Sequence, residues 1–206
     1  MCGRRVMSKG KAYANRKKEA DRPKGDLYET PSCLVKELLE HGDFPTDRDI
    51  TIYDPCCGHY AIGNVLRQYG YKDITEKDIL YGDDFLADYT DNTYDVVIMN
   101  PPFKLFDKFV EKAKRIADEV YCIGKLNYFG THDRKVKGFW DTLDTVYAFD
   151  RMIDYASPED KDGKVGVGMM VTGWFYWKKS CPPLFPLIKV FDVQKYIRSS
   201  KDIKEQ

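Results

Sequence analysis

The tetrapeptide Asn100-Pro101-Pro102-Phe103 follows directly on a run of apolar, β-favouring residues, 96–99. Proline has no backbone N–H and a fixed φ, so two consecutive prolines end a strand and stiffen the chain after it. The residue before a proline is also pushed toward extended conformations. The motif therefore presents an amide side chain, bare carbonyl groups and one aromatic face at a rigid strand end. These groups suit a flat molecule that carries an amino group.

Acidic residues stand at two other expected strand ends. Asp54 opens the stretch DPCCGHYAIG after the run 50–53, and its carboxylate can accept hydrogen bonds from a cationic or amino-bearing group. Gly58 in the same stretch allows the backbone to come close to a ligand. Glu76 and Asp78 lie near the end of the run 73–79, where an acid commonly binds the hydroxyls of a ribose. Asp78 is the better candidate, because Ile79 follows it and could pack on a purine. A glycine turn or a solvated acid explains each feature equally well when it is taken alone.

A third stretch, GDDF, adds the acid-aromatic pair Asp84-Phe85. The carboxylate suits the amino group of an adenine and the ring suits its face, although a core phenylalanine in a turn is an equally good explanation. The joint pattern is much less probable by chance than any of its members. Together these strand ends predict a site for an adenosine-like ligand and its reaction partner.

The elements that must position these groups alternate along the chain. Helical spacing covers 30–42, 61–70, 106–119 and 134–143, and β-rich runs cover 50–53, 73–79, 94–99, 120–125, 145–153 and 168–179. The last two runs predict an antiparallel hairpin around the polar loop 154–167, whereas 186–200 indicates no clear element. The alternation predicts an α/β fold with a doubly wound parallel sheet, in which ligands lie outside the carboxyl ends of the strands.

Charge is balanced overall but unevenly distributed. The 206 residues contain 33 basic and 33 acidic side chains, and 43% of the residues are apolar. Residues 1–25 hold nine Lys or Arg against Glu19 and Asp21, so this stretch is +7 and the remainder is −7. A basic arm on an acidic body can bind phosphates, and it can equally be a solvated tail. We expect a flexible tail over 1–25 and one domain over 26–206.

The six cysteines form no CxxC pair, and no Cys/His spacing suits zinc, so we expect no metal site. The sequence shows no signal peptide and no apolar run long enough to cross a bilayer. These features predict a cytoplasmic protein with free thiols and no membrane partner.

From about residue 26 to residue 179 these motifs resemble, in order, those of S-adenosylmethionine-dependent DNA adenine-N6 methyltransferases, most of all compact phage-type enzymes of the Dam type. DLYETP, DPCCG, GDDF, NPPF and GWFYWKK carry the resemblance, and NPPF is the most specific of them. The family implies a Rossmann-like class I methyltransferase fold with a mostly parallel seven-stranded sheet and a C-terminal antiparallel hairpin. It also implies S-adenosylmethionine as the cofactor, bound by Tyr28, Thr30, Pro31, Asp54, Pro55, Cys56, Gly58, Asp78, Ile79, Asp84 and Phe85.

The resemblance also implies a mechanism. The Asn100 oxygen and the Pro101 carbonyl would accept hydrogen bonds from the target amine, Phe103 would stack on the purine, and the two prolines would fix these acceptors in place. One departure concerns the cofactor loop, where the family usually has a small residue, often glycine, at the position of Tyr60. The tyrosine could narrow the cofactor pocket or point away from it.

The implied substrate is an adenine in DNA, single-stranded or flipped out of its helix. The family motif fits RNA adenine enzymes as well, and a catalytically silent nucleic-acid-binding relative is a further alternative. Glutamine-N5 enzymes more often carry Tyr in the last position, and cytosine-N4 enzymes more often carry Ser in the first. No room is left for a separate target-recognition domain, so we expect relaxed specificity or a specificity partner. The expected backbone contacts are Lys104, Lys108, Arg134, Lys135 and Lys137.

Overall fold

A computed structural model describes residues 28–89, 93–156, 159–160, 162–180 and 183–198. The predicted basic tail over 1–25 lies outside the described residues, as do Cys2 and Cys181.

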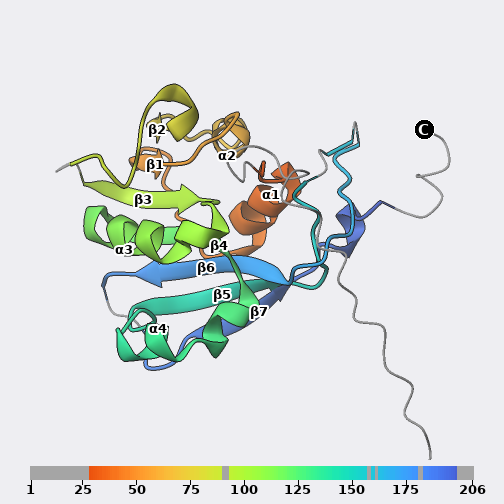
Figure 1. Ribbon diagram of the computed structural model, residues 1–206. Coiled ribbons are helices and arrows are strands. Elements are labelled where there is room, and N and C mark those ends of the chain that lie inside the picture. Colours follow the sequence, from red (N-terminus) through yellow and green to blue (C-terminus); the bar gives the residue numbers. More distant parts are fainter. Residues whose placement is uncertain (1–27, 90–92, 157–158, 161, 181–182, 199–206) are drawn as a thin grey trace, which may run out of the picture.

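Seven strands form a single mixed sheet in the order β2-β1-β3-β4-β6-β5-β7 (Figure 1). Strand β6 runs antiparallel to both of its neighbours, and all other neighbouring pairs are parallel. The predicted α/β class, the mostly parallel sheet and the antiparallel hairpin of β5 with β6 are confirmed. The strands are β1 (Ile52–Asp54), β2 (Ile74–Glu76), β3 (Tyr94–Met99), β4 (Ala117–Lys125), β5 (Leu143–Phe149), β6 (Thr172–Lys178) and β7 (Leu187–Phe191).

Helices cover both faces of this sheet (Figure 1). Val96 and Ile98 of β3 pack in one apolar cluster with α1 and α2, whereas Val97 and Met99 pack in a second cluster with α3. Burial on both faces explains why the strands read as continuous apolar runs rather than as an alternating pattern. The helices are α1 (Ser32–His41), α2 (Ala61–Gln68), α3 (Phe106–Ile116) and α4 (His132–Val136).

Two predicted helix boundaries were wrong, and one stretch that had no predicted element contains a strand. The helix predicted over 106–119 ends at Ile116, because Ala117 and Glu119 pair with β3 and belong to β4. The helix predicted over 134–143 is limited to the short α4. The chain then turns through Gly138, which has a φ of 64°, and Phe139 enters the core. The unassigned stretch 186–200 contains the edge strand β7, whose outer residues stay exposed and therefore show no burial pattern.

The parallel arrangement places three strand ends at one edge of the sheet. β1 pairs with both β2 and β3, so the residues that follow these three strands emerge side by side. Asp54 is the last residue of β1, and Asn100 comes directly after β3. The fold therefore brings together the segments in which the sequence placed its candidate residues.

Candidate cofactor and substrate site

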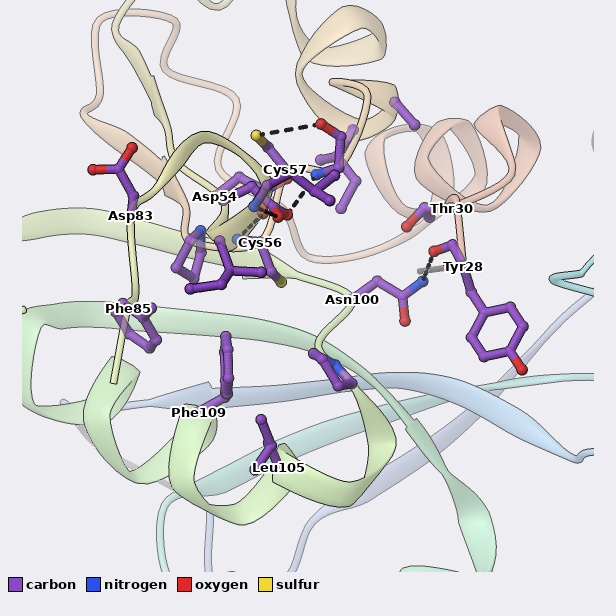
Figure 2. Close-up of a pocket in the computed structure, with 18 of the residues that line it drawn as sticks. Tyr28, Thr30, Asp54, Cys56, Cys57, Asp83, Phe85, Asn100, Leu105 and Phe109 are labelled. Carbon is purple, nitrogen blue, oxygen red and sulfur yellow. Dashed lines mark hydrogen bonds between the residues drawn. The ribbon is translucent and has the colours of Figure 1, made fainter. Parts of the chain in front are cut away.

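A cavity of about 270 Å³ lies at this edge, between the turns after β1, β2 and β3 and the segment that precedes α1. Figure 2 shows Phe85 and Phe109 at one end of it and Asn100 with Tyr28 at the other, with Asp54 and Cys56 between them. Pro31 is absent from its lining and precedes α1 instead. The predicted cofactor residues that line the cavity are Tyr28, Thr30, Asp54, Pro55, Cys56, Gly58, Asp78, Ile79, Asp84 and Phe85.

Asp54 is fully buried in the middle of the cavity wall. One carboxylate oxygen, Oδ1, accepts a hydrogen bond from the Cys56 backbone N–H at 3.1 Å, and Oδ2 has no partner among the described residues. Burial raises the pKa of Asp54 to about 8, and the neighbouring carboxylates of Glu76 and Asp78 act in the same direction. A buried carboxylate without a partner is costly, so this oxygen is suited to a cationic ligand group.

Asp78 connects the turns after β1 and β2. Its Oδ2 accepts a hydrogen bond from the Gly58 N–H and its Oδ1 accepts one from the Leu80 N–H, both at 2.9 Å. A carboxylate offers about four lone-pair positions, so acceptor capacity remains for ligand hydroxyls. Glu76, the other acid near the end of β2, pairs with Arg67 and does not line the cavity.

The segment with Asp84 and Phe85 forms the far wall. The ring of Phe85 is 3% exposed, and its centroid lies 5.1 Å from the ring centroid of Phe109 and 5.8 Å from that of Tyr53. Asp84 is exposed, and its Oδ1 accepts a hydrogen bond from the Leu86 N–H at 2.9 Å. The second carboxylate oxygen remains available as an acceptor at the mouth of the cavity.

Asn100 lines the opposite end and is held in a defined orientation. Its side-chain Nδ2 donates a hydrogen bond to the Tyr28 carbonyl at 3.2 Å (Figure 2). Because the nitrogen is used in this way, the Oδ1 atom is presented as an acceptor. Pro102 also lines the cavity, whereas Pro101 and Phe103 do not.

Phe103 is half-buried and packs against the apolar core beside this end of the cavity. The Lys125 Nζ lies 4.6 Å from the centroid of its ring, and the Tyr155 ring meets it edge-on at 6.4 Å. The hydroxyl of Tyr128 donates a hydrogen bond to the Phe103 carbonyl at 3.1 Å. The motif is therefore fastened to the segment after β4 as well as to the segment before α1.

Tyr60 points away from the cavity and is not part of its lining. It has a φ of 65°, in the left-handed region that glycine adopts most easily, and its ring stacks on Tyr81 at 5.6 Å. The Tyr81 hydroxyl in turn donates to the Gly58 carbonyl at 3.0 Å. The sequence left open whether Tyr60 narrows the cofactor pocket or points away from it, and the structure favours a side chain that points away.

Sequence reasoning missed several lining residues. His59 Nδ1 and Glu29 Oε1 lie 2.5 Å apart, which joins the loop after β1 to the segment before α1. The apolar spacing of the predicted helices was a usable signal for Ile62 and Phe109, and Glu29, Cys57 and Asp83 lie within the motifs DLYETP, DPCCG and GDDF. The missed residues are Glu29, Cys57, Ala61, Ile62, Leu80, Asp83, Leu86, Leu105 and Phe109.

The predicted basic residues divide into two kinds. Arg134 is used within the protein, where its guanidinium donates to Asp107 at 2.8 Å, to the Thr131 hydroxyl at 3.0 Å and to the Tyr128 carbonyl at 3.2 Å. It also lies over the Tyr128 ring at 4.3 Å. The other four predicted residues are exposed lysines, namely Lys104, Lys108, Lys135 and Lys137.

Three other features lie outside this chemistry. The described cysteines are free, and burial raises the pKa of Cys33 and of Cys57 to about 12, which keeps both thiols protonated. Ligand atoms of Glu37, Glu40 and His41 lie within 4.8 Å of one another, but Glu37 is already paired with Lys195. Within the described residues, no helix combines the length and apolar character needed to cross a membrane.

Comparisons with known proteins identify the fold. No family model matches the sequence, and no curated protein matches it. A Pyrococcus horikoshii protein assigned as an RNA methyltransferase superposes with a TM-score of 0.54 at 17% identity, over 75% of this chain and 85% of that one. The type I restriction-modification methyltransferase subunit of Streptococcus thermophilus gives 0.57 at 14%, over 86% of this chain and 52% of that one. A Vibrio vulnificus modification subunit, assigned to a type I restriction enzyme, gives 0.55 at 13%, over 87% and 51%.

This chain spans about half the length of the two restriction-modification subunits. At sequence identities of 13% to 17%, the similarity to these proteins concerns only how the backbone is arranged. The sheet order, the helices on both faces and these superpositions together show that the chain has the Rossmann-like fold of class I methyltransferases.

Proposed function

We propose that this protein transfers a methyl group from S-adenosylmethionine to the N6 amine of adenine in DNA. The observation that carries the proposal is the fixed amide of Asn100, which lies at one end of a cavity whose other groups suit an adenosine. The structural neighbours support the same chemistry, since they are described as RNA methyltransferase and restriction-modification methyltransferase proteins.

The residues that line the cavity fit the cofactor. The free Oδ2 of Asp54 would accept hydrogen bonds from the ammonium group of the methionine part, and Asp78 would bind the ribose hydroxyls. Ile79 and Phe85 would contact the adenine ring, and Asp84 would accept from its amino group. When bound, S-adenosylmethionine supplies an electrophilic methyl group on a sulfonium.

Asn100 and Pro101 would prepare the nucleophile. The exocyclic amine of adenine is a weak nucleophile because its lone pair is delocalised into the ring. Acceptance of its two hydrogens by the Asn100 Oδ1 and the Pro101 carbonyl favours a pyramidal nitrogen whose lone pair faces the methyl group. Transfer would form the N–C bond as the C–S bond of the bound cofactor breaks, and the amine would then release one proton to solvent. The contribution of the protein is positioning and electrostatics, with no general base.

The target base would have to leave its helix to reach Asn100, and Phe103 would then stack on it. Exposed Lys104 follows the motif directly, and exposed Lys108 lies on α3. Lys135 and Lys137 lie on and after α4, and all four could bind the phosphate backbone. We assign Arg134 to the support of Tyr128 behind Phe103 rather than to the nucleic acid. The reaction would take place in the bacterial or phage-infected cytoplasm, and a partner could supply sequence specificity.

The test measures where the methyl group goes. The purified protein is incubated with deuterium-methyl S-adenosylmethionine and unmethylated DNA and RNA, and each is digested to nucleosides for mass spectrometry. We expect label on N6 of deoxyadenosine, and we expect Asn100→Ala to slow its appearance about 10²- to 10³-fold. Label only on adenosine would move the substrate to RNA. Absence of both label and cofactor binding would favour a silent nucleic-acid-binding relative, whereas cofactor binding without label would point to a missing partner or a protein substrate.

A further inference from the structure

Lys112 is a buried lysine on α3 whose ammonium is directed at the wall of the cavity. The residue is 8% exposed, and its Nζ donates hydrogen bonds to the main-chain carbonyls of Phe85 and Asp88. The same Nζ lies 4.7 Å from the centroid of the Phe85 ring. A buried ammonium is costly unless its donors are satisfied, and here its known acceptors come from one short segment.

The segment Asp84–Asp88 depends on such support because of its place in the fold. It follows β2, which is the terminal strand of the sheet, and no described strand pairs with the outer edge of β2. Its internal contacts are turn bonds, from Ala87 N–H to the Asp84 carbonyl at 3.0 Å and from Asp88 N–H to the same carbonyl at 2.9 Å. No strand ladder therefore holds the carbonyls of Phe85 and Asp88, and Lys112 takes that place.

Helix α3 contacts Phe85 through two side chains. Phe109 and Lys112 are three residues apart and so lie on the same side of the helix. The Phe109 ring lies 5.1 Å from the Phe85 ring, and the Lys112 ammonium lies over the Phe85 ring and binds the Phe85 carbonyl. The ring and the backbone of Phe85 are thereby held by one helix.

We propose that Lys112 is a positioning residue for recognition of the adenine of the cofactor, acting through Phe85 and Asp84. The inference rests on the proposed function for the identity of the ligand. Lys112 does not line the cavity, so it acts on the adenine only through the segment that it holds. If that segment is loosened, the site should lose its ability to distinguish the 6-amino group of adenine from other substituents at this position.

The experiment compares two ligands that differ at this one group. Dissociation constants for S-adenosylhomocysteine and for its deaminated analogue, S-inosylhomocysteine, are measured by calorimetry with the full chain. Lys112→Met keeps the length of the side chain and removes its donors, whereas Lys112→Arg keeps donors. Lys114→Met is the matched control, because Lys114 also lies on α3 and donates to a carbonyl, that of Phe139 at 3.3 Å, away from the cavity.

We expect Lys112→Met to weaken binding of S-adenosylhomocysteine about tenfold or more and to change binding of the inosyl compound little, so that the preference for adenine falls. Lys112→Arg should recover part of the preference, and Lys114→Met should leave it unchanged. A lower melting temperature for Lys112→Met with an unchanged preference would overturn the inference and leave the proposed function intact. A wild-type protein that binds neither ligand would overturn both. If Lys112→Met does not fold, Lys112→Gln is tested on the same preference.

Discussion

Two ends of the cavity are held by different means. At the catalytic corner (Asn100–Phe103), the key amide follows directly on β3, and two adjacent prolines restrict the chain. At the adenine corner (Asp84–Asp88), the described part of the chain offers no strand partner, and the supporting ammonium of Lys112 lies on a helix, 27 positions after Phe85. Both corners use long-range contacts, which at the first corner are the hydrogen bonds from Asn100 to Tyr28 and from Tyr128 to Phe103. The difference is that strand β3 and the prolines add local support at the first corner, whereas the second corner has no such support among the described residues. Helix α3 is connected to both corners, because it begins at Phe106 directly after the catalytic motif and packs Phe109 and Lys112 against Phe85.

The largest effect is expected from Asn100→Ala. Loss of the amide acceptor should lower kcat for methyl transfer about 10²- to 10³-fold, as for removal of one group that stabilises a transition state. Binding of S-adenosylhomocysteine, measured by calorimetry, should hardly change. A parallel loss of cofactor affinity would mean that the catalytic corner also holds the cofactor, and the division between the two corners would fail.

Asp84→Ala is the corresponding change at the adenine corner. Loss of a hydrogen bond to a charged acceptor should weaken binding of S-adenosylhomocysteine about 10- to 100-fold. Because the methyl group is far from this end, kcat at saturating cofactor should stay close to the wild-type value. Steady-state kinetics at varied cofactor concentration separates the two parameters, and a fall in kcat alone would contradict the assignment.

Asp54 lies between the two corners and should make cofactor binding depend on pH. Its pKa of about 8 in the free protein means that the carboxyl group is mostly protonated at neutral pH, whereas the bound ammonium requires the carboxylate. Affinity for S-adenosylhomocysteine should therefore rise about tenfold per pH unit up to about pH 8 and then level off. Calorimetry in buffers of different ionisation enthalpy should detect release of a proton on binding.

The same carboxyl group affects stability with a defined sign. Its folded pKa is raised above the ordinary value of 3.8, so this group contributes no penalty below pH 4, and the free energy of unfolding falls as pH rises toward 8. Asp54→Asn should remove both this trend and the pH dependence of binding. If the pH dependence of stability or of binding persists in Asp54→Asn, another titratable group is responsible for it.

Pro102→Ala tests the local stiffness of the catalytic corner. The fixed φ of a proline removes freedom from the unfolded chain worth about 0.4–1 kcal/mol, so the free energy of unfolding should fall by about this amount. If the same freedom returns at the folded corner, kcat should fall about two- to fivefold. Cofactor affinity should be unaffected. A loss much larger than this would indicate a direct contact of Pro102 with the substrate, and an unchanged rate would show that packing around Phe103 alone holds the motif.

The smallest effect is expected for Tyr60→Gly. Glycine relieves a left-handed backbone position, worth about 1–2 kcal/mol, and removes a ring stack worth about 0.5–1.5 kcal/mol, so the melting temperature should change little. Binding of S-adenosylhomocysteine should also stay the same, because Tyr60 does not line the cavity. A clear gain in affinity would show that the tyrosine obstructs the site.

The sequence by itself determined the strand ends and their chemistry. Apolar runs, glycine turns and prolines are local signals, and they correctly placed Asp54, Asp78 and Asn100 at the carboxyl edge of a parallel sheet. Boundaries failed where pairing between distant segments overrode local preference, as when Ala117 joined β4 instead of extending α3. The edge strand β7 was missed because its exposed residues leave no burial pattern.

Tertiary structure alone decided how the candidate groups are held. No local pattern indicates that the Asn100 amide is oriented by the Tyr28 carbonyl, that Tyr60 stacks on Tyr81, or that Arg134 is used inside the protein. The same holds for Lys112. In the sequence it resembles the other lysines of its helix, but in the structure it is buried beneath the adenine corner. Such contacts join residues far apart in the chain, so they exist only once the sheet and its helices have packed.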